Sequence, residues 1–175
     1  MSPSLTLQTA VFQVNPEYNS RSSEAFTMTT RGTTGAILPL EAIYNHNAWL
    51  SGQYKAGWYY DTSNTTKIGS TQKANNRTGA YILVDQAIWR DEQDPESVLR
   101  AFGQAATSNA ATSAMRRWYA VGLVKQKPFA SRPQDSIAFA YGRAVFNSRS
   151  RDVQEAADAN PEQANMIANL DSGEQ

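Results

Sequence analysis

The feature of this sequence that most constrains its fold is an alternation of side-chain character with a period of two, clearest between Leu50 and Asp61. One set of alternate positions is mostly apolar or aromatic: Leu50, Gly52, Tyr54, Ala56, Trp58 and Tyr60. The other set is mostly polar: Ser51, Gln53, Lys55, Gly57, Tyr59 and Asp61. Because successive side chains of a β-strand point to opposite faces, the segment is predicted to be a strand with one apolar and one water-facing side.

Similar patterns predict further strands along the chain. They are Leu5 to Val14, Thr34 to Asn45, Gly79 to Asp91, Val98 to Thr107, Met115 to Lys125 and Ser136 to Phe146. Pro39 weakens the strand at Thr34 to Asn45, because proline cannot donate a hydrogen bond to a neighbouring strand. The sequence thus predicts about seven strands, each of the length that a tilted strand needs to cross a bilayer.

The connections between these segments alternate in length. Asn15 to Thr33, Thr62 to Arg77 and the region from Ser148 onward are long, and Ser108 to Ala114 is intermediate. The short connections are His46 to Trp49, Glu92 to Ser97 and Gln126 to Pro133. A bacterial outer-membrane barrel has short periplasmic turns and longer extracellular loops, and a soluble meander has no reason to follow this pattern. We expect Thr62 to Arg77 to be a solvated loop.

Composition excludes several other classes of protein. Lys plus Arg equals Asp plus Glu at 16 each, so no net charge favours nucleic acid. No window approaches the run of about 18 apolar residues that a spanning helix requires. Cysteine is absent, which excludes disulfides and thiolate sites and is compatible with an oxidising compartment. Met1 to Val11 lacks the pattern of a signal peptide, so either the protein is cytosolic or its beginning is missing.

The C-terminal region differs from the rest. Asp152 to Leu170 is rich in Ala, Glu, Gln and Asn, and is expected to form helical turns interrupted at Pro161. We therefore predict two regions: a partial β-barrel over 1–147, and a loop or a frayed, partly helical end over 148–175.

A series of short motifs resembles the carbohydrate-selective (OprB-type) porins. They occur in the family's order, at similar spacing, over roughly Leu5 to Asn147: Asn15-Pro16; Thr34-Gly35 with Pro39 and Glu41; Gly52-Gln53-Tyr54; Gly57 to Ser63; Gly79-Ala80-Tyr81 before Asp85-Gln86; Phe102-Gly103; Gly122-Leu123-Val124; and Arg132-Pro133 before Asp135.

This resemblance implies an all-β, antiparallel, up-and-down transmembrane barrel in the bacterial outer membrane. It implies passive passage of carbohydrates, with membrane lipid as surroundings, possible assembly of the full-length protein as a homotrimer, and no cofactor. A water-filled porin needs about 16 strands, so the chain is expected to be a fragment of the barrel.

Residues on the predicted water-facing side are candidates for the pore lining. Aromatic rings stack on the apolar side of a sugar, and charged groups replace water around its hydroxyls. The aromatic candidates are Tyr59, Tyr81, Trp89 and Trp118; the charged candidates are Glu41, Lys55, Asp85, Arg100 and Arg116. The alternative is that these aromatics are anchors at the membrane interface and the charges only solvate a lumen.

Other functions have less support in the sequence. His46 is the only histidine, and no further ligands at metal-binding spacing accompany it. Glu41 and Asp85 could be imagined as a glycosidase pair, but nothing fixes their separation, and we expect no enzyme. The remaining alternatives are a soluble carbohydrate-binding β-sandwich and a scaffold that pairs its sheet edges with partner strands.

Overall fold

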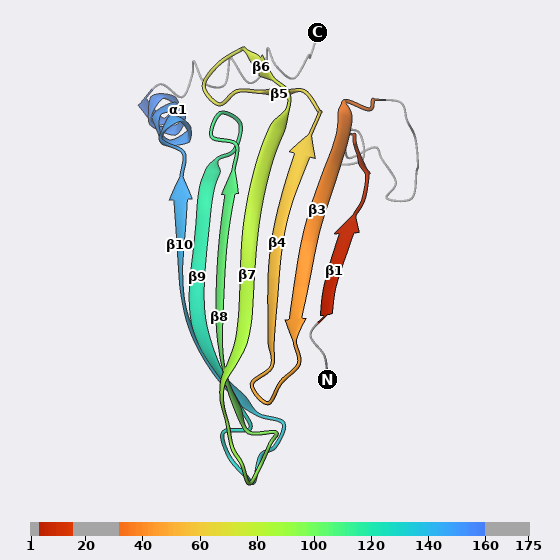
Figure 1. Ribbon diagram of the computed structural model, residues 1–175. Helices are drawn as coiled ribbons and strands as arrows, with labels where there is room; N and C mark the ends of the chain where they lie inside the picture. Colours follow the sequence, from red (N-terminus) through yellow and green to blue (C-terminus); the bar gives the residue numbers. More distant parts are fainter. Residues whose placement is uncertain (1–3, 16–31, 160–175) are drawn as a thin grey trace.

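The computed structural model describes residues 4–15 and 32–159 of the chain. The main sheet has the strand order β1, β3, β4, β7, β8, β9, β10, with β2 pairing beside β1 on β3. Its strands are β1 (Ser4–Thr9), β2 (Phe12–Val14), β3 (Gly35–His46), β4 (Gly52–Asp61), β7 (Arg77–Arg90), β8 (Val98–Ser108), β9 (Met115–Gln126) and β10 (Ser136–Phe146). All neighbouring strands of this sheet are antiparallel, and the sheet is not closed (Figure 1).

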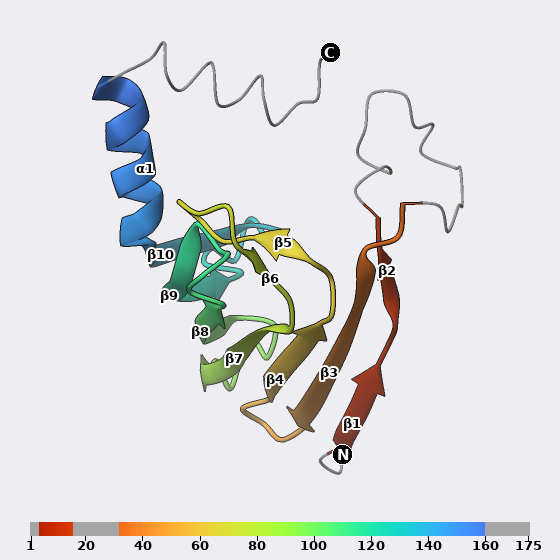
Figure 2. The same cartoon turned by 90° about the horizontal axis from the view of Figure 1, so that it is seen from above.

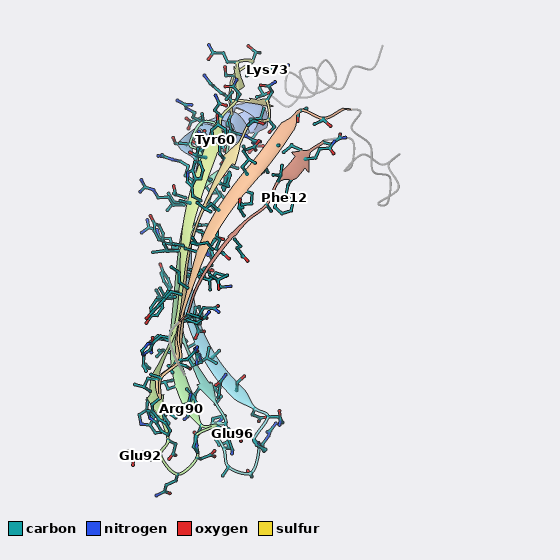
Figure 3. All side chains as sticks on the ribbon, turned by 45° about the vertical axis from the view of Figure 1, so that its right-hand side comes forward. Phe12, Tyr60, Lys73, Arg90, Glu92 and Glu96 are labelled. Atoms are coloured by element: carbon teal, nitrogen blue, oxygen red, sulfur yellow. The ribbon has the colours of Figure 1, made fainter. Side chains whose placement is uncertain are left out.

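The sheet is one layer thick. Seen from above, its strands form an open arc (Figure 2), and side chains project from both sides of the layer (Figure 3). Very few hydrophobic side chains are buried in the described residues: Ala87, Val98 and Ala120. Large ones stay exposed in mid-strand, such as Ile82 at 54% and Phe139 at 76%. A β-sandwich buries one face of each sheet against the other, so the soluble sandwich alternative does not describe this fold.

The predicted strands agree closely with the observed ones, and β10 has the predicted bounds. Two predictions need correction. Leu5 to Val14 is not one strand but two, β1 and β2, both paired with β3. Thr62 to Arg77 is not only a loop, because it contains a hairpin of β5 (Thr65–Thr66) and β6 (Lys73–Ala74). These strands are too short to give an alternating pattern.

The break between β1 and β2 explains how β3 accommodates Pro39. Thr9 pairs with Leu40 and Phe12 with Ile37, so Leu38 and Pro39 lie opposite the unpaired stretch. The Pro39 carbonyl accepts a hydrogen bond of 2.7 Å from the Thr9 hydroxyl, so it points toward β1. In a strand, the nitrogen of the same residue points to the same side, and the missing N–H therefore faces the break.

The connections at the two ends of the sheet differ only partly as predicted, because the six residues between β8 and β9 are fewer than the nine between β9 and β10. Short turns join β3 to β4, β7 to β8 and β9 to β10 at one end, which we call the turn end. The β5–β6 hairpin, the connection between β8 and β9, and α1 (Ser148–Ala159) lie at the other, the loop end (Figure 1). Most of the predicted loop at Asn15 to Thr33, and the chain after 159, lie outside the described residues. No helix among the described residues is long and apolar enough to cross a membrane.

Side-chain contacts tie the loop end together. The Asn147 side chain accepts from the backbone N–H of Arg149 at 3.2 Å and so caps the start of α1. Its amide also donates to the carbonyls of Ala110 and Ser113, and the backbone N–H of Ile68 donates to Ala111. Helix, hairpin and β8–β9 connection are therefore linked.

Candidate functional site: the polar face of the sheet

The register divides the sheet into two faces. One face carries most of the exposed large hydrophobic side chains, and we call it the apolar face: Leu38, Leu40, Trp58, Ile82, Val84, Tyr119, Val121, Leu123, Phe139 and Tyr141. The opposite face, which we call the polar face, carries most of the predicted site residues. Gln8, Glu41, Gly57, Tyr81, Ala106, Trp118 and Ala144 form one row across it from β1 to β10.

Glu41 lies near one end of this row and is held by two neutral donors. The Gln8 amide donates to Oε1 at 2.6 Å, and the Tyr81 hydroxyl donates to Oε2. Gln8 comes from β1, next to β3, whereas Tyr81 comes from β7 and reaches across Gly57 of the intervening strand β4. Neither donor is charged, and Glu41 forms no ion pair with a described residue.

A second polar group lies nearer the turn end. Arg100 of β8 forms an ion pair with Asp85 of β7, in which Nε donates to Oδ1 at 2.5 Å. The side chain of Asp85 remains 49% exposed, and its other oxygen forms no hydrogen bond with a described residue. Beside this pair is a hollow of about 320 Å³, which we call the polar hollow; it is lined by Gln53, Lys55, Leu83, Val84, Asp85, Phe102, Gly103 and Gln104. The hollow thus presents a cation, an anion and two amides around one aromatic ring.

Aromatic rings on the polar face lie over glycines of the neighbouring strand. A Cβ added to Gly57 would meet the Tyr81 ring at 2.3 Å, and one added to Gly79 would meet the Tyr59 ring at 2.3 Å. The same arrangement pairs Gly122 with Phe102 at 2.5 Å and Gly142 with Trp118 at 2.9 Å. Each ring therefore lies along the wall and not upright on it. By contrast, Gly103 belongs to the apolar face and has no atom closer than 3.9 Å.

Trp89 is not on the polar face, and its predicted placement there is wrong. A bulge between Ala87 and Trp89 shifts the register, so that Ala87 pairs with Arg100 but Trp89 pairs with Leu99. The extra residue sends the Trp89 ring to the opposite side. There the Lys125 ammonium lies 4.1 Å from its centroid. An amphipathic ring near a strand end suits the membrane interface.

Buried polar contacts fix the loop end of the polar face. Asp61 of β4, 3% exposed, forms an ion pair with Arg77 of β7. Its Oδ1 also accepts from the backbone N–H of Ser63 at 2.8 Å, and Arg77 donates to the Ser63 hydroxyl at 2.8 Å. The cluster anchors the start of the connection that carries the β5–β6 hairpin.

An ion pair links two turns at the other end. Lys127 of the β9–β10 turn contacts Asp94 of the β7–β8 turn at 2.7 Å and Glu96 at 3.2 Å. The hydrogen bond from Lys127 lowers the pKa of the Asp94 carboxyl, and the hydrogen bonds to Asp94 and then Glu96 raise the pKa of Lys127. Both charged forms are therefore favoured.

The structure places eight of the nine predicted site residues on the polar face. It brings Glu41 to Tyr81, places Lys55 and Asp85 at one hollow, and pairs Asp85 with Arg100. Arg116 and Trp118 lie on the same face of β9, nearer the loop end. Sequence reasoning missed Gln8, Gln53, Phe102 and Gln104 as site residues. Each of them occupies a water-facing position in the alternating pattern, which could have identified it. The prediction selected charged residues, tyrosines and tryptophans instead.

A one-layered antiparallel sheet with an exposed apolar face, a polar opposite face and six strands of 10 to 14 residues defines part of a transmembrane β-barrel. The comparisons agree with this class. The sequence matches the family described as "Carbohydrate-selective porin, OprB family" over residues 1–174. The chain belongs to that family, and its location is the bacterial outer membrane.

Individual relatives are more distant. The chain is 28% identical over 163 residues to the protein named putative porin QuiX of Acinetobacter baylyi, covering 87% of this chain and 36% of the relative. It is 25% identical over 162 residues to Porin B of Pseudomonas aeruginosa, covering 83% and 36%. The chain thus spans about a third of the length of these relatives. A solved structure of OprB from Pseudomonas putida at high pH matches with a TM-score of 0.81 and 24% identity, over 92% of this chain and 41% of that one. This likeness supports the fold.

Proposed function

We propose that this chain forms part of the wall of an outer-membrane channel through which carbohydrates pass passively and chemically unchanged. The observation that carries the proposal is the division of a single layer into an apolar and a polar face. Lipid covers the apolar face, and the polar face lines a water-filled lumen. The name of the family supports carbohydrate as the class of solute.

The polar hollow is the best candidate for sugar contact. Lys55 can donate hydrogen bonds to hydroxyls, Gln53 and Gln104 can both donate and accept them, and the half-exposed carboxylate of Asp85 can accept them. Phe102 offers an apolar surface to one side of a pyranose ring. Glu41, Tyr59, Tyr81, Arg116 and Trp118 extend this lining toward the loop end. Because many weak contacts line the path, the solute can move between them without tight binding.

Solute flux into vesicles that contain the complete barrel, with the substitutions made in this part of its wall, tests this proposal. We expect Asp85→Asn combined with Lys55→Gln to change the flux of a hexose more than that of an acyclic polyol of the same carbon number. The matched control is Arg143→Gln, which removes a cation from the apolar face of the same sheet. Equal effects of the two changes on hexose flux would count against a lumen on the polar side.

We also propose that the assembled protein is a homotrimer in which parts of the apolar face contact other copies. Support comes from the breadth of exposed apolar surface, which either lipid or a second copy can cover. Cross-linking in native membranes tests this proposal. We expect cross-linked trimers, and recovery of monomers alone would oppose it. Residues 148–175 are proposed to lie outside the barrel wall.

A further inference from the structure

Charge on the apolar face is unevenly distributed. In the described strands of the main sheet, the charged residues on this face are Arg117, Lys125 and Arg143, and carboxylates are absent from it. All three are cations. Lipid-facing charge is costly in the middle of a membrane, so its presence needs a physical reason.

Lys125 is accounted for by its neighbours. It lies at the turn end, where its ammonium donates to the Ser97 hydroxyl at 2.7 Å and contacts the Trp89 ring. Arg117 and Arg143 are different: both are exposed, and neither forms an ion pair or a hydrogen bond with another described side chain. Arg117 has described strands on both sides, and Thr107 and Val145 lie opposite it.

The two arginines are neighbours near the loop end of the sheet. Arg117 pairs with Val145 and Tyr119 pairs with Arg143, so the arginines are diagonal across β9 and β10. Diagonal positions lie about 7–8 Å apart, within reach of one shared anion for two long side chains. Near a strand end an arginine can extend its guanidinium to the membrane surface, where phosphate groups are found.

An apolar hollow lies beside this pair. It has a volume of about 400 Å³, and its lining includes Ala80, Ile82, Ala105, Thr107, Arg117 and Tyr119. Small side chains on β7 and β8 form its floor, and Ile82 and Tyr119 border it. A hollow of this kind on a lipid-facing surface suits an acyl chain, and Arg117 belongs to its lining.

We propose that Arg117 and Arg143 bind the phosphate of a lipid headgroup, and that the hollow beside them takes an acyl chain of the same lipid. Bacterial barrels carry their longer loops on the extracellular side. The lipid therefore belongs to the outer leaflet. The site depends on the placement of the sheet in a membrane and not on which solute passes through the lumen.

Lipid retention measured by native mass spectrometry tests the site. The folded protein is taken from phosphatidylcholine vesicles that contain either bisphosphorylated lipid A or the same lipid with both phosphates removed. We expect the protein to retain the phosphorylated form roughly tenfold better, given the attraction of each basic residue to an anionic surface. Arg117→Gln with Arg143→Gln should abolish this preference. Arg116→Gln, one position away on the polar face, should preserve it.

Several results would overturn the proposal. They are equal retention of the two lipids by the unchanged protein, equal losses in the double variant and in Arg116→Gln, or a double variant that alters only the number of protein copies per assembly. Arg117→Lys with Arg143→Lys keeps both charges and should keep most of the preference, which separates lost binding from lost folding. Hexose flux should be unchanged in the double glutamine variant, so this test and that of the channel fail independently.

Discussion

The two faces of this sheet differ in the exposure and pairing of their side chains. On the apolar face, side chains such as Ile82 and Val121 stay more than half exposed, with no second layer over them. On the polar face, charges are held in specific contacts, as in Asp61 with Arg77 and Glu41 with Tyr81. The difference teaches that side-chain pairing stabilises the polar face, whereas the apolar face depends on the lipid that we propose covers it.

The largest expected effect comes from placing a charge on the apolar face. Ile82→Arg should lower the free energy of unfolding by about 2–4 kcal/mol in lipid vesicles, the cost of an arginine near the bilayer midplane. Leu83→Arg, the next residue on the polar face, should cost much less, although it faces Lys55 across the strands. Urea titration of both variants in vesicles measures this, and equal costs would contradict two distinct faces.

A somewhat smaller effect is expected at the buried ion pair. Asp61→Asn should destabilise the protein by up to about 3 kcal/mol, because Arg77 would keep its charge in a half-buried place without a carboxylate. Proteolysis of the β5–β6 connection should become faster at the same time. The matched control is Asp91→Asn in the turn at the other end of the sheet. It should leave proteolysis of the β5–β6 connection unchanged.

Replacing glycine by alanine should affect stability differently on the two faces. Gly57→Ala should cost about 1–3 kcal/mol, because the new methyl group displaces the Tyr81 ring from the wall. Gly103→Ala on the apolar face has open space and should be neutral or slightly stabilising. Unfolding in urea distinguishes the two, and similar costs would show that the ring does not lie over Gly57.

The bulge predicts different roles for two tryptophans. Trp118→Ala should change hexose flux, because the Trp118 ring lies on the polar face over Gly142. The free energy of unfolding of the protein in vesicles should change little. Trp89→Ala should do the reverse and lower stability in vesicles by roughly 1 kcal/mol, as expected for an interfacial ring with a nearby cation. A large flux change from Trp89→Ala alone would place this ring back in the lumen.

The smallest effect is expected at the turns. The pKa of Asp94 is lowered, so its stabilising contribution is present above the ordinary carboxyl pKa and is lost as pH falls through the lowered value. The pKa of Lys127 is raised, so its contribution is lost only as pH rises through that raised value. Protection from hydrogen exchange in these turns, measured relative to the intrinsic rate at each pH, should therefore fall at the two extremes of pH. Lys127→Gln should remove both dependences.

The alternation of side chains was enough to predict the strands and most of the polar face from sequence. It failed where one residue changes the count: the bulge before Trp89 reverses the face of that ring without altering the local composition. It also missed β5 and β6, which are two residues each. Predicting the contacts of Tyr81 and Trp118 with glycines would have needed the register between strands. Predicting that β3 accommodates Pro39 would have needed the break between β1 and β2.

The orientation of the two faces is tested most directly by labelling alternate positions of β7 in lipid vesicles. The chain has no cysteine, so single substitutions at Ala80, Tyr81, Ile82, Leu83 and Val84 each introduce one thiol. A fluorophore attached at 80, 82 or 84 should be quenched by a bilayer-embedded quencher, and one attached at 81 or 83 by a water-soluble quencher. Uniform quenching along the strand, or the opposite alternation, would contradict this account.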